Sequence, residues 1–127
     1  MATEILLNDG GAPARILPFK AGGTVTAGQP VKMNTSAEVV QNDLVAHKPL
    51  GIALTTVSSG SMASIITGMG VILKANCTGS IAGGDALDTA AGGSLSTTAD
   101  ASKAVAIYID SDSHAGAASL QKILYLG

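Results

Sequence analysis

The stretch VTAGQPVKMNTSAEV, residues 25–39, is followed later in the chain by IAGGDALDTAAGGSL, residues 81–95. The two stretches match in residue type at four positions, which are Val25 with Ile81, Gly28 with Gly84, Val31 with Leu87 and Val39 with Leu95. All four pairs have the same separation along the chain, 56 residues (81 − 25 for the first pair). A constant separation of apolar and glycine positions indicates that one structural unit occurs twice.

Short runs of alternating or β-branched residues follow one another along the chain, separated by clusters of Gly, Ser, Asn and Asp. This pattern is typical of an all-β sandwich or barrel rather than of alternating strands and helices. We therefore predict an all-β fold, a compact β-barrel or β-sandwich built from two similar β units, with an extended N-terminal arm. The predicted arm covers residues 1–22 and the β domain residues 23–127, with its two units at about 25–75 and 79–127.

Composition and charge exclude several classes of function. The net charge is −2 and 13% of the residues are charged, so the chain has no basic stripe for phosphate groups and we expect no nucleic-acid binding. It has neither a secretion signal at its start nor an apolar stretch of membrane-spanning length, so we expect synthesis in a cytoplasm and no membrane contact. Aromatic residues make up only 2% of the chain, which limits the area each residue buries, and we expect neighbouring molecules to contribute to stability.

The segment AIYIDSDSHAG holds the most chemically loaded residues of the chain, Asp110, Asp112 and His114. A calcium loop of the EF-hand type starting at Asp110 requires glycine at its sixth position and glutamate at its twelfth, where this chain has Ala115 and Gln121. A zinc site would require further histidine or cysteine ligands. The matching loop of the first unit, TVSSGSM, has neither acid nor histidine. We therefore interpret the segment as a solvent-exposed hairpin connection and predict no metal and no cofactor.

No pattern in the sequence indicates catalysis. The chain has two histidines, His47 and His114, and neither belongs to a recognisable catalytic arrangement. It contains no GxSxG nucleophile elbow and no phosphate-binding loop. We predict that the protein is not an enzyme and has no catalytic residues.

The N-terminal segment TEILLNDGGAPARILPFKAGG precedes the repeat that we recognise in the sequence. Pro13 and Pro18 bar a continuous helix and favour an extended path or a strand at the edge of a sheet. The segment is either an ordinary first strand with its loop, or an arm that adds a strand to the sheet of a neighbouring molecule. In the second case the candidate contact residues are Ile5, Leu6, Leu7, Arg15, Ile16, Leu17 and Phe19.

The order of these runs resembles that of the small capsid decoration, or cement, proteins of tailed bacteriophages. The runs that carry the resemblance are TVTAGQPVKM, PLGIAL with its Gly/Ser loop, GVILKANC, SIAGGDALDT and AVAIYI…LYLG, which together cover roughly residues 20–127. The resemblance implies a virion structural protein on the outer surface of an icosahedral head. It further implies a homotrimer that bridges subunits of the major capsid protein after the shell expands, with the N-terminal residues above as contacts to capsid or subunit. Deletion of residues 1–19 is then expected to weaken attachment.

A small β-barrel binding module for carbohydrate or for a host surface is the alternative function. Carbohydrate sites generally need aromatic platforms, and the chain has one phenylalanine, two tyrosines and no tryptophan. Saturable sugar binding by the isolated protein would favour this alternative, and stoichiometric binding to capsids would favour the decoration protein.

Overall fold

The computed structural model describes residues 6–8, 15–42, 49–68, 70–90, 92–98 and 104–126, and for residues 6–8 it describes the backbone alone. Within these ranges all regular secondary structure is β-strand, arranged in two sheets. None of the described residues forms a helix with the length and apolar character needed to cross a bilayer. The prediction of an all-β fold is confirmed.

The first sheet is a five-stranded barrel, which we call the first barrel. Its strands are β2 (Arg15–Lys20), β3 (Pro30–Met33), β4 (Val39–Gln41), β5 (Gly51–Ala53) and β6 (Met62–Thr67). They lie in the order β2-β6-β5-β3-β4, with antiparallel neighbours. A parallel bridge between Ala21 and Val39 joins the end of β2 to β4 and closes the barrel.

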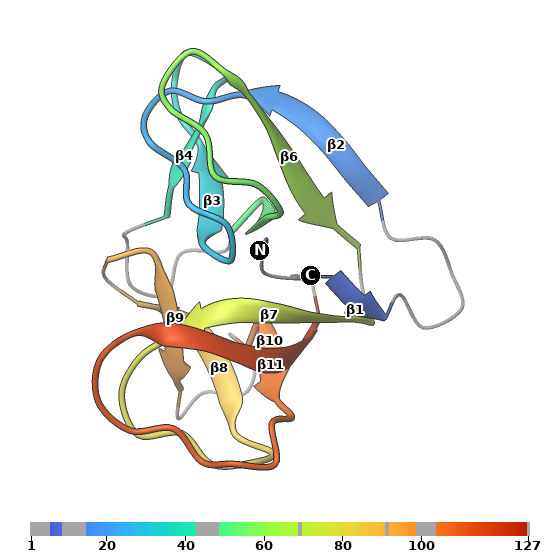
Figure 1. Cartoon of the computed structure of the whole chain (residues 1–127), viewed down its shortest axis with the longest axis vertical. Helices are drawn as coiled ribbons and strands as arrows, with labels where there is room; N and C mark the ends of the chain where they lie inside the picture. The colour runs from blue at the N-terminus through green and yellow to red at the C-terminus, as the bar shows by residue number, and fades with distance from the viewer. Residues whose placement is uncertain are drawn as a thin grey trace.

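The second sheet contains a barrel with the same strand order, which we call the second barrel. Its strands are β7 (Val71–Cys77), β8 (Ala86–Ala90), β9 (Ser94–Thr97), β10 (Ala106–Tyr108) and β11 (Ser119–Tyr125), in the order β7-β11-β10-β8-β9. A parallel pairing of Cys77 with Leu95 closes it. One more strand, β1 (Leu6–Asn8), adds to the other edge of β7. Figure 1 shows the first barrel above and the second below, with β7 lying between them.

The hydrogen bonds of the two barrels repeat each other, which confirms that the chain contains two similar β units. Val25 exchanges backbone hydrogen bonds with Val57 (3.0 and 2.8 Å), and Ile81 does so with His114 (2.8 Å in each direction). The turns that follow are also equivalent, because Gly28 and Gly84 both have positive φ, 89° and 88°. Glycine adopts this left-handed conformation without the steric cost that other residues incur.

The strand order begins each unit earlier than the expected bounds of 25 and 79. The first barrel starts with β2 and the second with β7, so residues 71–75 open the second unit rather than end the first. The turn glycines mark the middle of each unit, so they do not reveal β2 and β7, the strands that precede them. A further signal was present, because Ile16–Leu17 and Ile72–Leu73 are identical pairs 56 residues apart (72 − 16).

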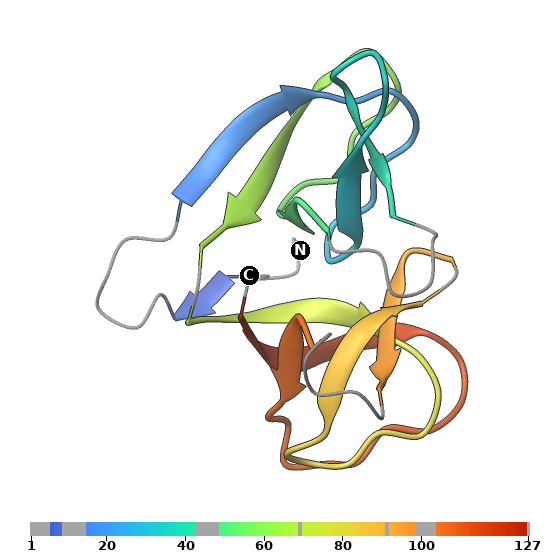
Figure 2. The ribbon, with the colours of Figure 1, turned by 180° about the vertical axis from the view of Figure 1, so that it is seen from behind.

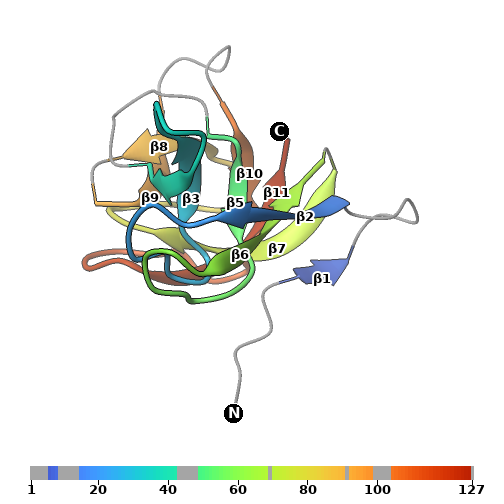
Figure 3. The same cartoon turned by 90° about the horizontal axis from the view of Figure 1, so that it is seen from above.

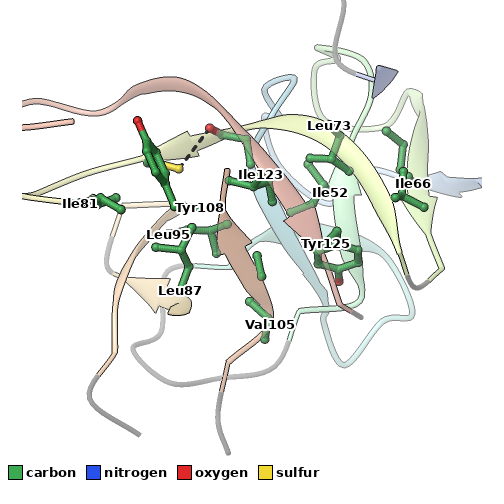
Figure 4. Packing of buried hydrophobic residues seen from close by; sticks show 14 residues of the cluster. Ile52, Ile66, Leu73, Ile81, Leu87, Leu95, Val105, Tyr108, Ile123 and Tyr125 are labelled. Carbon is green, nitrogen blue, oxygen red and sulfur yellow. Dashed lines mark hydrogen bonds between the residues drawn. The ribbon is translucent and has the colours of Figure 1, made fainter. Parts of the chain in front are cut away.

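Two apolar clusters fill the molecule. The smaller one lies within the first barrel and consists of Ala21, Val25, Val31, Val39, Ala53, Ala63 and Ile65. The larger one fills the second barrel and also receives Ile52 and Ile66 from the first (Figure 4). Successive side chains of a strand point to opposite faces, so Ile65 lies in its own barrel while Ile66 packs against the other. The two barrels therefore share one packed interface.

Gly51 stands where β5 passes close to β6. A Cβ atom at this position would overlap the carbonyl oxygen of Ile66 and would lie 2.8 Å from Cγ2 of Ile65. The counterpart of Gly51 in the second barrel is Ala106, because Gly51 lies opposite Val31 and Ala106 lies opposite Leu87. The first barrel is therefore the more tightly closed of the two at this point.

We predict that Gly51→Ala lowers the free energy of unfolding by about 2–3 kcal/mol, because the backbone of β6 has to move. The matched variant Ala106→Gly is expected to lose about 1 kcal/mol, the ordinary cost of glycine in a strand. Urea denaturation of both variants measures the difference. Equal losses would contradict the close approach at Gly51.

The two tyrosines are the largest buried side chains and lie on opposite sides of the larger cluster in Figure 4. The Tyr108 hydroxyl donates to the carbonyl oxygen of Asp112 (2.7 Å) and to Oε1 of Gln121 (3.1 Å), which share its one proton. The Tyr125 hydroxyl is buried and has no hydrogen-bond partner among the described residues. Burial raises the pKa of Tyr125 from 10.0 to about 12. Burial likewise raises the pKa of Cys77 from 9.0 to about 12, with the charge of Asp110 as a smaller cause.

We predict opposite effects of removing the two hydroxyls. Tyr108→Phe is expected to lower the free energy of unfolding by about 1–2 kcal/mol, because the groups that accept its proton lose their donor. Tyr125→Phe is expected to raise it by up to about 1 kcal/mol, because no bond is lost and a buried polar atom is removed. A loss in Tyr125→Phe as large as that in Tyr108→Phe would show that the Tyr125 hydroxyl has a partner.

The wild type and Tyr125→Phe also test the pH dependence of the free energy of unfolding. The folded pKa of Tyr125 lies above the unfolded value of 10.0, so the stability held by its neutral form is complete below pH 10 and is lost as the pH rises toward 12. At about 1.4 kcal/mol per pKa unit, this loss is of the order of 2–3 kcal/mol. In urea denaturation followed as a function of pH, Tyr125→Phe is expected to lose less stability at alkaline pH than the wild type. The loss due to Cys77 is expected in both proteins.

Candidate functional site

The loop between β10 and β11, which contains Asp110, Asp112 and His114 and which we call the acidic loop, uses its side chains to bind main-chain groups. Oδ1 of Asp110 accepts a hydrogen bond from the Asp112 amide, and Oδ2 accepts one from the Lys122 amide, both at 3.3 Å. His114 is buried, and its Nδ1 lies 2.8 Å from the carbonyl oxygen of Gly79 and its Nε2 3.0 Å from that of Ala117. Both ring nitrogens therefore lie within hydrogen-bond distance of main-chain oxygens, and the tautomer decides which nitrogen donates. No group of three metal-ligating side chains occurs in the described part of the chain.

An open depression of about 340 Å³ lies beside this loop, lined by Ser80, Ile81, Ala82, Asp85, Ser113, His114 and Ala115. Its acid, Asp85, accepts a hydrogen bond from the Ala82 amide at 2.9 Å and so stabilises the turn that contains Gly84. Gln29 takes the same place in the first barrel, where its Oε1 accepts a bond from the Thr26 amide at 3.1 Å. Asp85 and His114, the two titratable groups of the depression, thus both contact main-chain groups of the loops that form it.

We predict that His114→Val lowers the free energy of unfolding by about 0.5–1.5 kcal/mol, because hydrogen bonding between the ring and the main-chain oxygens of Gly79 and Ala117 is lost. Valine is the residue at the equivalent position of the first barrel, Val57, so the backbone pairing with Ile81 should survive. Ser113→Ala, at an exposed neighbour in the same depression, should change stability by less than about 0.5 kcal/mol. A His114→Val protein as stable as the wild type would show that these bonds contribute nothing.

The aromatic side chains do not form a platform for a sugar ring. Tyr108 and Tyr125 are fully buried, and Phe19 is half-buried against the smaller cluster. These three are all the aromatic residues of the chain. Stacking on exposed aromatic rings, the basis of the carbohydrate-binding alternative, therefore has no residues to carry it.

The candidate contact residues fall into two groups. Arg15, Ile16, Leu17 and Phe19 lie in β2, which is hydrogen-bonded along β6 from Arg15 opposite Thr67 to Lys20 opposite Met62. Leu6 and Leu7 lie in β1, which pairs with β7 of the same chain, and Ile5 lies outside the described residues. Leu6 and Leu7 therefore lie on the second barrel, and the candidate residues of β2 lie on the first.

Among the described strands, β2 exposes its apolar side chains most. Ile16 and Leu17 are 44% and 42% exposed, and Arg15 and Pro18 are exposed beside them. Among the described residues, β2 pairs with β6 alone, apart from the bridge from Ala21 that follows it. Figure 2 shows β2 at the margin of the first barrel, with β6 on its inner side. Pro18 suits this position, because an edge strand tolerates a residue without an N–H.

Basic side chains stand at both ends of β2. Arg15 begins the strand, and Lys20 ends it with its Nζ 3.5 Å from Oε2 of Glu38. The Lys20 side chain is 59% exposed, so solvent screens this ion pair. In the described residues the edge thus combines an apolar centre with cationic ends and backbone groups that β6 does not pair, which are the features that an added strand uses.

Comparisons with known proteins give a match of fold. No protein-family model matches the chain, and no curated protein matches its sequence. Among solved structures, the chain is similar to the head fiber gp8.5 N base of bacteriophage phi29, with a TM-score of 0.71 over 89% of this chain and 94% of that chain. The two chains share 15% sequence identity, so what the likeness shows is a common fold.

Proposed function

We propose that this chain is a structural protein of a bacteriophage virion that binds the outer surface of the head. The observation that carries the proposal is the likeness in fold to a phage head fiber base, which extends over nearly the whole of both chains. The order of runs in the sequence, which resembles that of capsid decoration proteins, points to the same class independently. Binding rather than catalysis also agrees with the use of the acidic loop and of His114 to hold main-chain groups.

In this proposal the protein acts by linkage. A protein that binds the expanded shell better than the unexpanded one shifts the balance toward the expanded state and against rupture. Bridging of neighbouring major capsid subunits, as a homotrimer, would supply this preference. Many identical sites on one shell give avidity without a strong single interface, which suits a small protein of low charge.

The proposed surface for contact with the capsid or with a neighbouring subunit is the N-terminal segment together with β2. Its residues are Ile5, Leu6, Leu7, Arg15, Ile16, Leu17 and Phe19. The exposure of Ile16 and Leu17 supports this assignment, because apolar side chains on an unpaired edge lose their contact with water only when a partner covers them.

We predict that the purified protein co-sediments in saturable amounts with undecorated expanded heads and not with unexpanded ones. The plateau of bound protein gives the number of copies per head. Absence of binding to both kinds of head from the correct virus would contradict the proposal.

A truncation of the N-terminal segment tests the contact surface in the same assay. Deletion of residues 1–19 would remove β2 and with it a strand of the first barrel, so the informative truncation ends at residue 14. It should weaken binding to expanded heads while leaving the urea midpoint nearly unchanged. Leu17→Asn tests the edge itself, and Ser58→Asn, at an exposed position of another loop, is its control. Full binding by the truncated protein would show that the segment is not a contact.

A further inference from the structure

We propose that the free edge of β2 binds the N-terminal segment of a second copy of this chain, as an added antiparallel strand. The proposal concerns how copies associate with one another. It is tested on the purified protein without heads, so its failure and the failure of head binding are distinguishable.

The internal repeat shows that a strand fits this edge. In the second barrel, β1 pairs antiparallel with β7 at Ile72–Leu73. The equivalent pair in the first barrel is Ile16–Leu17, because Leu17 lies opposite Ile65 of β6 in the way that Leu73 lies opposite Ile123 of β11. The edge of β2 is therefore the position that β1 occupies in the other barrel. Figure 3 shows β1 beside the end of β7, with which it pairs.

The side chains at the two edges differ in exposure, as expected if a strand covers the edge of β7 and none covers the edge of β2. Leu73 is fully buried, whereas its counterpart Leu17 is 42% exposed, and Ile16 is 44% exposed. Pro18 has no N–H, so it belongs on the outward side of β2, where its position costs no bond to β6. Outward and inward groups alternate along a strand, so the backbone N–H and C=O of Ile16 also face outward. They provide a donor and an acceptor for an added strand.

Charge selects the N-terminal segment as the occupant. In the sequence, the acids Glu4 and Asp9 lie on either side of Leu6–Asn8, and β2 begins with Arg15 and ends with Lys20. Transfer of the β1–β7 register to β2 sets Asp9 opposite Arg15. On β7 that place is held by Val71, and the lysine of β7, Lys74, lies in the middle of the strand, so a basic residue in the place opposite Asp9 occurs only on β2. Pairing of β2 with β2 of another copy would instead bring like charges together.

The connection between β1 and β2 is long enough for exchange between copies. Six residues, 9–14, separate the two strands, and an extended chain of this length spans up to roughly 24 Å between Asn8 and Arg15. The pairing of β1 with its own β7 covers only three residues and has a shift of register between Leu6 and Asn8. So short and irregular a pairing contributes little stability, and the segment can leave its own barrel.

Charge exchange between positions 9 and 15 tests the proposal in trans. Sedimentation equilibrium is measured for the wild type, for Asp9→Arg, for Arg15→Asp and for an equimolar mixture of the two variants. Each variant alone should associate roughly tenfold more weakly than the wild type, since like charges then oppose each other. The mixture should recover the wild-type dissociation constant to within about threefold, because each variant then meets its complement. Unchanged urea midpoints confirm that both variants are folded.

Deletion of residues 1–8 removes the proposed strand and leaves β2 intact, and it should abolish the association. Three results would overturn the proposal. A wild type that is monomeric at all concentrations would mean that the segment stays within its own chain. Association that survives the deletion would mean that β2 edges or other surfaces meet directly. A mixture no tighter than the single variants would mean that positions 9 and 15 do not pair between copies.

Discussion

The narrow interior of a five-stranded barrel is the constraint on which the rest of this structure depends. Few strands leave little room inside, so the residues where each barrel closes have to be small. Ala21 and Cys77 take these closing positions, and both are fully buried. Gly51 and Ala106 are also small residues, where the central strands approach their neighbours. The abundance of small residues and the scarcity of aromatic ones follow from this geometry rather than from a flexible chain.

The sequence predicts those parts of the fold that depend on local backbone geometry. A glycine with positive φ is required at the same place in each unit, so Gly28 and Gly84 mark the repeat, and the apolar residues around them keep their spacing. The starts of the units were harder to predict, because β2 and β7 pair with strands about fifty residues further on. Such pairing leaves only a short apolar motif, Ile-Leu, in each copy. The exposure of Ile16 and Leu17 is also a property of the assembled sheet, since their apolar character alone suggests burial.

The two barrels differ where their surroundings differ. The second barrel has Tyr108 where the first has Ala53, so its interior is filled by its own side chains. The first barrel directs Ile52 and Ile66 outward into the neighbouring cluster. His114 replaces the valine of the first copy and ties two loops together through main-chain oxygens. The residues that look like a reactive cluster in the sequence therefore hold main-chain groups of the second barrel, whereas the proposed contact residues of β2 lie on the first barrel. This distribution was not accessible from residue types alone.

The interface between the barrels also sets the order in which the chain can fold as it is made. All strands of the first barrel are synthesised once Thr67 has left the ribosome, and among the described strands they pair only with one another. The outward side chains Ile52 and Ile66, however, are covered by residues from β7 onward. Completing β11 takes roughly sixty further residues, which at typical rates of synthesis is several seconds. During that interval the nascent first barrel presents an uncovered apolar face, so the half-made chain, rather than the finished protein, is the species most exposed to aggregation.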